Sequence, residues 1–258
     1  MPPGVLEERR QRVFLILASI FIGAMAMLNI IGITRFVHIG PLALAVGVLP
    51  YPLTFLCTDL IGELYGRRRA NFVVWVGLGI NLFVILTLWV GQLLPAVPLG
   101  SQPPWQTLSL SGPVNLPSGR SVHGQVELYH LIYACTAGAV LASMAAYMAA
   151  QFCDVYLFHF WKRLTRGRHF WLRNNGSTLV SQLVDSVMVI SITFGAAYWK
   201  GQQTLGTMLV LLGSNYVFKF AAALLDTAPA YVAVHYLSRY LQIDPTREHG
   251  DGETDGPP

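Results

Sequence analysis

The stretch YPLTFLCTDLIGELYGRRRA, residues 51–70, decides how the rest of the chain is interpreted. It begins like the second half of a membrane helix, carries Asp59 and Glu63 four residues apart, and ends on the arginines 67–69. A block of positive charge directly after an apolar segment is typical of the cytoplasmic end of a membrane helix. The acids need another explanation, because an ionised side chain at the centre of such a helix costs about 2.5–3.5 kcal/mol on insertion scales.

The surrounding sequence is that of an integral membrane protein. Of its 258 residues, 53% are hydrophobic and 12% are charged, which is about half the charged share of soluble domains. Apolar stretches of sufficient length to cross a bilayer predict an all-α, polytopic protein with six transmembrane helices. The predicted helices are 13–33, 39–62, 71–94, 127–160, 176–199 and 205–238. A long connection rich in Pro, Gly and Ser, 95–126, precedes the fourth helix.

The basic residues predict the orientation of these helices. Counted by alternation from the N-terminus, thirteen of the 17 Lys and Arg residues fall on one side and three on the other. Because positive residues accumulate in the cytoplasm, both termini are expected to be cytoplasmic. The chain then divides into a cytoplasmic segment at 1–12, a transmembrane domain at 13–240 and a disordered polar tail at 241–258. No cleavable signal peptide is expected, since the first apolar run is long for one.

Three predicted helices carry an acid with a polar neighbour on the same face. Residues three or four positions apart lie on one side of a helix. These pairs are Asp59 with Glu63, Gln151 with Asp154, and Gln182 with Asp185. Ser177 and Ser181 continue the stripe that leads to Asp185, and the last helix carries Asn215, Lys219 and Asp226 at helical spacing. Two prolines within predicted helices, Pro52 and Pro229, are expected to open them locally, because proline removes a backbone donor.

Each polar group has a structural interpretation beside a functional one. Asp59 and Glu63 lie within about two turns of Arg67, with which either acid can form an interfacial ion pair. The polar stripe that ends at Asp185 can join helices through hydrogen bonds. Lys219, the one ammonium within a predicted span, is expected to neutralise a neighbouring acid.

The functional interpretation places these groups in one polar cavity toward the cytoplasmic half. Asn29 and Asn81 would add uncharged donors, and Tyr147 and Tyr216 aromatic faces. A planar heterocycle with a guanine-like edge suits this set, because one carboxylate accepts two adjacent N–H donors while an amide or a hydroxyl meets the carbonyl. Protons, metal ions and cationic drugs also favour buried acids, so the residues alone leave the ligand open.

Four stretches carry a family resemblance. They are PLTFLCTDLIGELYGRRRA (52–70), AYMAAQFCDVYLFHFWKR (146–163), WLRNNGSTLVSQLVDS (171–186) and NYVFKFAAALLDTAPAY (215–231). In this order they resemble the queuosine precursor transporter family, also called the vitamin uptake transporter family. The resemblance implies a bacterial inner-membrane importer of 7-cyano-7-deazaguanine and 7-aminomethyl-7-deazaguanine. The motif residues carried over are Asp59, Glu63, Gly66, Gln151, Asp154, Arg173, Ser177, Thr178, Gln182, Asp185 and Lys219.

The predicted function is import of a 7-deazaguanine base, the partner molecules being this base and the lipid bilayer. The predicted substrate-binding residues are Asp59, Glu63, Gln151, Asp154, Arg173, Ser177, Gln182, Asp185, Lys219, Tyr147 and Asn29. The alternative is a substrate-binding membrane subunit that needs an energising partner. The scattered Cys and His residues predict no metal site, and no cofactor or nucleic-acid partner is expected. An enzyme is disfavoured because no G-x-S-x-G elbow is present. Homodimer formation, and whether transport is coupled to protons, stay open.

Overall fold

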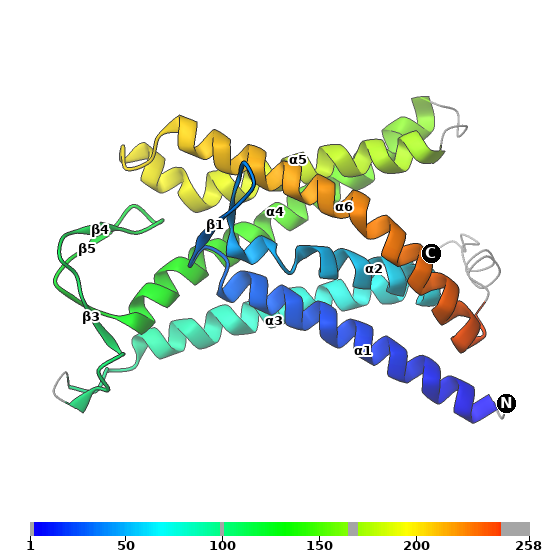
Figure 1. The fold of residues 1–258 in the computed structure, drawn as a ribbon, viewed down its shortest axis with the longest axis horizontal. Helices are drawn as coiled ribbons and strands as arrows, with labels where there is room; N and C mark the ends of the chain where they lie inside the picture. Colours follow the sequence, from blue (N-terminus) through cyan, green and yellow to red (C-terminus); the bar gives the residue numbers. More distant parts are fainter. Residues whose placement is uncertain (1–2, 99–100, 165–169, 244–258) are drawn as a thin grey trace, which may run out of the picture. The chain divides into compact units, whose positions relative to one another are not determined.

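A computed structural model of the chain describes residues 3–98, 101–164 and 170–243. Within these ranges the side chains of residues 3, 67, 151, 154–155, 158–159, 161–163, 170–178 and 227 are left undescribed. The described residues form six α-helices (Figure 1), so the protein predicted to be all-α is mostly helical, with short strands in two of its connections. The helices are α1 (Pro3–Ile30), α2 (Tyr51–Tyr65), α3 (Arg67–Leu93), α4 (Leu128–Leu164), α5 (Phe170–Trp199) and α6 (Leu205–Leu241).

Five helical segments of the described residues are long and apolar enough to cross a membrane. They are Gly4–Ile30, Arg68–Leu93, Leu128–Ala150, Leu179–Trp199 and Leu205–Leu241. The remaining helix, α2, has 15 residues, which is short for a full crossing of about 20 residues. The protein is therefore a polytopic membrane protein with five candidate spans rather than the predicted six.

The predicted helix at 39–62 is wrong in its first half. Residues 36–45 form an antiparallel hairpin of β1 (Phe36–Ile39) and β2 (Leu42–Ala45), followed by the short 3-10 helix η1 (Val46–Val48). Gly40 stands in the turn at φ +57°, a conformation that glycine adopts without a steric penalty, and Pro41 follows it. The apolar residues of this segment are compatible with a membrane helix, but Gly40 and Pro41 place a turn in its middle.

The expectation that Pro52 opens a helix from within is also wrong. Pro52 occupies the first turn of α2, where the N–H that proline lacks would have no helical acceptor. At the other end of α2, Gly66 at φ +85° ends the helix and lets the chain continue directly into α3. The arginines that follow are therefore the first turn of α3. Pro229 lies inside α6, as expected.

The connection before α4 is more ordered than its composition predicts. It contains two antiparallel pairs of short strands, one of β3 (Thr107–Ser109) with β6 (Gln125–Glu127) and one of β4 (Val114–Asn115) with β5 (Ser121–Val122). Thr107 lies opposite Glu127 and Ser109 opposite Gln125. These pairs satisfy backbone groups that an irregular loop would leave to water.

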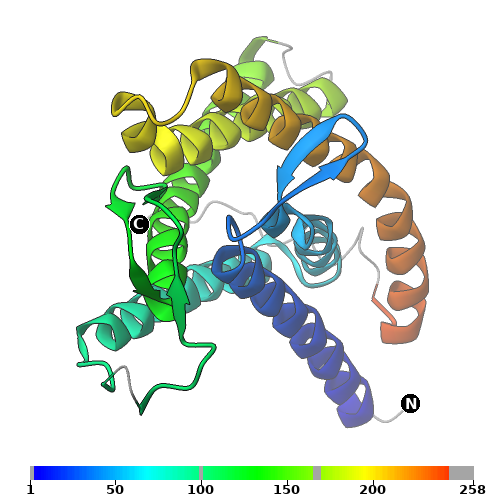
Figure 2. The same cartoon turned by 60° about the vertical axis from the view of Figure 1, so that its left-hand side comes forward.

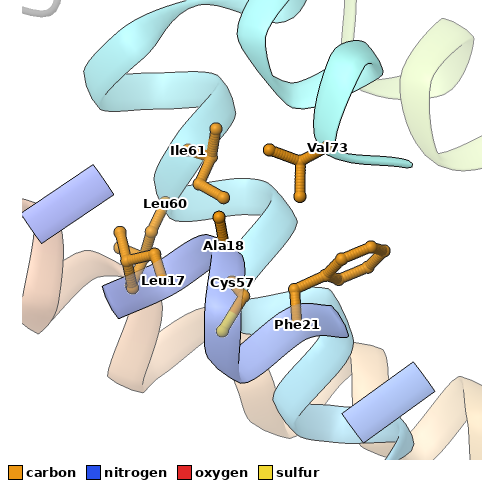
Figure 3. Packing of buried hydrophobic residues seen from close by; sticks show 7 residues of the cluster. All are labelled: Leu17, Ala18, Phe21, Cys57, Leu60, Ile61 and Val73. Carbon is orange, nitrogen blue, oxygen red and sulfur yellow. The ribbon is translucent and has the colours of Figure 1, made fainter. Parts of the chain in front are cut away.

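The chain divides into two compact units. The first comprises Met1–Ala26, Pro50–Ile80 and Ala221–Pro258, and the second Met27–Leu49 and Asn81–Phe220. The core of the first unit is a cluster of buried side chains from α1, α2 and α3, shown in Figure 3. Its members are Leu17, Ala18, Phe21, Cys57, Leu60, Ile61 and Val73. Ala233, Val234 and Leu237 of α6 pack against this cluster, so four helices meet there.

Arg10 joins the helix ends of the first unit. Its Nε donates to the carbonyl of Leu241 at 3.1 Å and its Nη2 to that of Gln242 at 2.8 Å. The last carbonyls of a helix have no partner within it, so the guanidinium caps α6. The hydroxyl of Tyr65 donates to the Arg10 carbonyl at 2.8 Å. Leu241 and Ile243 are buried here, whereas the rest of the predicted disordered tail, 244–258, lies outside the described residues.

The second unit is built on the antiparallel helices α4 and α5, which pack along one another (Figure 1). The hairpin of β1 and β2 reaches α6 (Figure 2), where the backbone N–H of Ala43 donates to Ser214 Oγ at 3.1 Å. Thr136 Oγ1 of α4 donates to the carbonyl of Ile30 at 3.0 Å. These hydrogen bonds attach the hairpin and the end of α1 to the helices that carry the polar residues.

Candidate functional site

A cluster of buried polar side chains lies where α5 and α6 meet in the second unit. We name it the α5–α6 polar seam. Its members are at most 9% exposed, although both helices are mostly apolar. They are Ser181, Gln182, Asp185 and Ser186 of α5 and Ser214, Asn215 and Lys219 of α6. Polar residues that face the interior of a membrane protein are costly and mark candidate substrate or ion sites.

The spacing of these residues explains why they face inward together. Gln182, Asp185 and Ser186 recur at three and four residues, as one face of a helix requires. The neighbouring Leu183 and Val187 are exposed. In this part of α5 the polar side chains therefore face inward, while the apolar side chains between them face outward.

Asp185 and Lys219 form a buried ion pair in which Lys219 Nζ donates to Asp185 Oδ2. The prediction that Lys219 neutralises an acid is therefore confirmed. A buried charge is tolerated only when it is paired, and each of these two supplies the other's counter-charge. An ionised carboxylate accepts about four hydrogen bonds, so Asp185 keeps acceptor capacity beyond the bond from Lys219.

Two further hydrogen bonds fix α6 against α5. Asn215 Nδ2 donates to Ser186 Oγ at 3.3 Å, and the hydroxyl of Tyr216 donates to the carbonyl of Leu179 at 3.4 Å. The expectation that Tyr216 stacks on a flat ligand stays a prediction. Along α6 both bonds lie about one turn before the ion pair, and they hold its side chains in register with those of α5.

Other predicted site residues of the second unit fall into two groups. Asn29 is buried near the end of α1, and Tyr147 is half-buried on α4. Four more belong to α4 and α5 by their backbone, but their side chains are among those left undescribed. These four are Gln151, Asp154, Arg173 and Ser177. Their role in binding stays a prediction.

Asp59 and Glu63 belong to the first unit, where both are exposed on α2. The alternative in which they pair with Arg67 involves a side chain outside the described set. The prediction that one cavity collects acids from four helices also stays a prediction, because these acids and Asp185 lie in different units.

Two residues that the sequence analysis left out of its substrate-binding set, Asp226 and Asn81, stand out in the structure. Asp226 is 8% exposed, and its Oδ2 has no hydrogen-bond partner among the described residues. Asn81 is 1% exposed, and neither polar atom of its side chain finds a partner in the described part of the chain. The sequence could have singled out Asp226. The predicted spans contain several acids but only one lysine, so at least one acid in them must lack a lysine partner.

No group of three His, Cys, Asp or Glu side chains in the described ranges is arranged to hold a metal ion. The polar seam itself contains one carboxylate and one ammonium, with amides and hydroxyls around them. This set can recognise a polar organic molecule through donors and acceptors, without a metal.

Comparison with known proteins identifies the family. The family model described as "Putative vitamin uptake transporter" matches residues 45–233. A protein of Bacillus subtilis named "Probable queuosine precursor transporter" is 27% identical over 83% of this chain and 82% of its own length. A protein of the same name from Haemophilus influenzae is 24% identical over 76% of this chain and 71% of its own. No solved structure matches the chain. The family is one of transporters and not of enzymes. Because the family match covers most of the chain, this multi-pass membrane protein belongs to the vitamin uptake transporter family.

Proposed function

We propose that this protein imports 7-deazaguanine bases, precursors of queuosine, across the bacterial inner membrane, with both termini in the cytoplasm. The observation that carries the proposal is the α5–α6 polar seam, in a family whose relatives are named queuosine precursor transporters. The distribution of Lys and Arg supports the orientation.

The chemistry of the seam supports a guanine-like substrate. A guanine edge offers a ring N–H and an exocyclic amine side by side, and Asp185 has acceptor capacity for both. Lys219 supplies the counter-charge of Asp185 in the buried pair. Gln182 lies one turn away on the same face of α5 and supplies an amide donor for the carbonyl of the base. Tyr147 would cover the ring face, and Asn29 would add a further amide.

The remaining predicted residues extend the proposed path of the substrate. They are Asp59, Glu63, Gln151, Asp154, Arg173 and Ser177. Pro229 interrupts the hydrogen bonds of α6 three residues after Asp226. Interrupted helices are a common means of exposing a substrate site alternately to the two sides of a membrane, and we assign this bending to α6.

The purified protein alone in liposomes tests this proposal. We expect labelled 7-cyano-7-deazaguanine to enter and to exchange, with guanine-edge analogues competing and 7-deazaadenine failing to compete. Gln182→Met removes the amide but keeps the length of the side chain, and should raise the half-saturating concentration about 2- to 10-fold, the range for one hydrogen bond. Ser191→Ala, at an exposed position of α5, is the matched control and should leave uptake unchanged.

Two other outcomes are informative. Saturable binding without entry or exchange would favour the alternative, a substrate-binding subunit that needs an energising partner. Neither binding nor uptake of the base would show that the proposed substrate is wrong.

A further inference from the structure

A polar pocket of about 380 Å³ lies where the connection before α4 meets the ends of α3 and α4, entirely within the second unit. Its polar lining consists of Gln92, Ser121, His123, Gln125, Glu127 and His130. Small-molecule sites range from about 300 to 1,000 Å³, so a single base fits. Gln92 is next to the last residue of α3, whereas residues 67–69 begin it. The pocket is therefore at the end of α3 opposite to the arginines.

Hydrogen bonds fix the polar groups of this pocket. His130 Nδ1 lies 3.3 Å from Gln92 Oε1. Since an amide oxygen only accepts, Nδ1 must carry the proton, which leaves the Gln92 amide nitrogen as a donor. On the other side, Glu127 Oε1 accepts from Gln102 Nε2 at 3.1 Å, and Gln102 Oε1 accepts from Thr107 Oγ1 at 2.5 Å.

The strand pair β3–β6 holds the carboxylate of this pocket in place. Glu127 is paired with Thr107 across the two strands, and the adjacent Val126 is buried. Glu127 is itself half-buried, while His123 and Gln125 are exposed at the rim of the pocket. A molecule from the aqueous side can thus reach a carboxylate whose position is set by backbone pairing.

The lining selects among classes of ligand. It contains a carboxylate but no Lys or Arg, which disfavours anions. No metal-holding group of three side chains occurs in the described part of the chain, this pocket included. The pocket thus offers the same two kinds of group as the α5–α6 polar seam, a carboxylate and an amide donor. The carboxylate accepts hydrogen bonds from adjacent N–H groups, and the amide donates one to a neighbouring carbonyl.

We propose that this pocket is an outer binding site for the same 7-deazaguanine base, which occupies it before reaching the α5–α6 polar seam. Glu127 accepts the two N–H groups of the guanine edge, and the Gln92 amide donates to the carbonyl. His130 orients that amide. The inference rests on the proposed function, because it names the same substrate.

Uptake kinetics in liposomes test the outer site. Glu127→Gln preserves the shape of the side chain and should raise the half-saturating concentration of 7-cyano-7-deazaguanine about 10-fold or more, since the lost hydrogen bonds are to a charged acceptor. Gln92→Leu should act in the same direction. The maximal rate should change by less than about 2-fold, because the seam is intact. Ser109→Ala, exposed on β3 and outside the lining, is the control and should behave like the wild type.

Equilibrium binding to the purified protein gives an independent readout. The wild type should bind two molecules of 7-cyano-7-deazaguanine per chain and Glu127→Gln one. A single bound molecule together with unchanged kinetics in Glu127→Gln would overturn the outer site while the proposed function stands. Wild-type protein that neither binds nor transports the base would overturn the proposed function and this inference with it.

Discussion

Lys219→Met is expected to destabilise the protein by about 3–5 kcal/mol, the usual cost of breaking a buried ion pair from one side. Lys219 is 4% exposed and its ammonium donates to Asp185. Without it, the carboxylate would be buried beside amides and hydroxyls but without a counter-charge. The same substitution should abolish uptake, because Asp185 would then either bind a proton or draw water into the seam.

A double-mutant cycle measures this pair directly. Thermal unfolding in detergent should show that Asp185→Asn and Lys219→Met are each strongly destabilising, whereas the double variant regains most of the lost stability. The double variant should still fail to transport, because no carboxylate remains in the seam. Lys200→Met, at an exposed position directly after α5 where Nζ donates to the Gly119 carbonyl, is the control and should lose about 1 kcal/mol or less. Additive losses at Asp185 and Lys219 would contradict the coupling.

Gly47→Ala is expected to have the second largest effect, a destabilisation of about 3 kcal/mol or more, at the upper end for overpacking. An added Cβ would lie 2.5 Å from the carbonyl oxygen of Leu28 and 2.6 Å from Gly32 Cα. Both are backbone atoms, so neither can rotate away. The N–H of Gly47 also donates to the Gly32 carbonyl at 3.0 Å, which draws the two segments together.

The consequence of Gly47→Ala should extend to transport. The residue follows the β1–β2 hairpin, which is bound to α6 through Ala43 and Ser214. Displacement of the hairpin should weaken that contact and lower uptake. Limited proteolysis and thermal unfolding measure the change. Gly79→Ala in α3, where an added Cβ meets nothing within 4 Å, should shift stability by less than about 1 kcal/mol. Equal behaviour of the two variants would show that the close approach at Gly47 does not matter.

The sequence predicted the helices well and the hairpin badly, for one physical reason. Apolar runs predict burial or membrane insertion but do not by themselves separate a helix from a hairpin. In residues 36–50 the separating signals were Gly40, Pro41 and Pro50, which were outweighed by the apolar composition around them. The extra length of α1 came from Glu, Arg and Gln, which favour helices although they are not apolar.

The sequence predicted which residues of the candidate site share a helix face, but not which neighbouring helix each face contacts. Helical spacing placed Gln182 with Asp185, and Asn215 with Lys219, on single faces. It could not say which neighbouring helix each face meets. Lys219 shares a stripe with Asp226 of its own helix, but its ammonium binds Asp185 of α5. Partner choice depends on how helices pack, which is a property of the whole unit and not of one segment.

The most direct test of the central claim is the queuosine content of tRNA. The host is a bacterial strain that lacks both precursor synthesis and its own transporter, supplied with a low concentration of 7-cyano-7-deazaguanine. The account predicts that this protein restores queuosine, that the Asp185→Asn/Lys219→Met variant does not, and that Lys200→Met does. No queuosine in the presence of wild-type protein, with the protein shown to be in the membrane, would contradict import of this base by the protein acting alone.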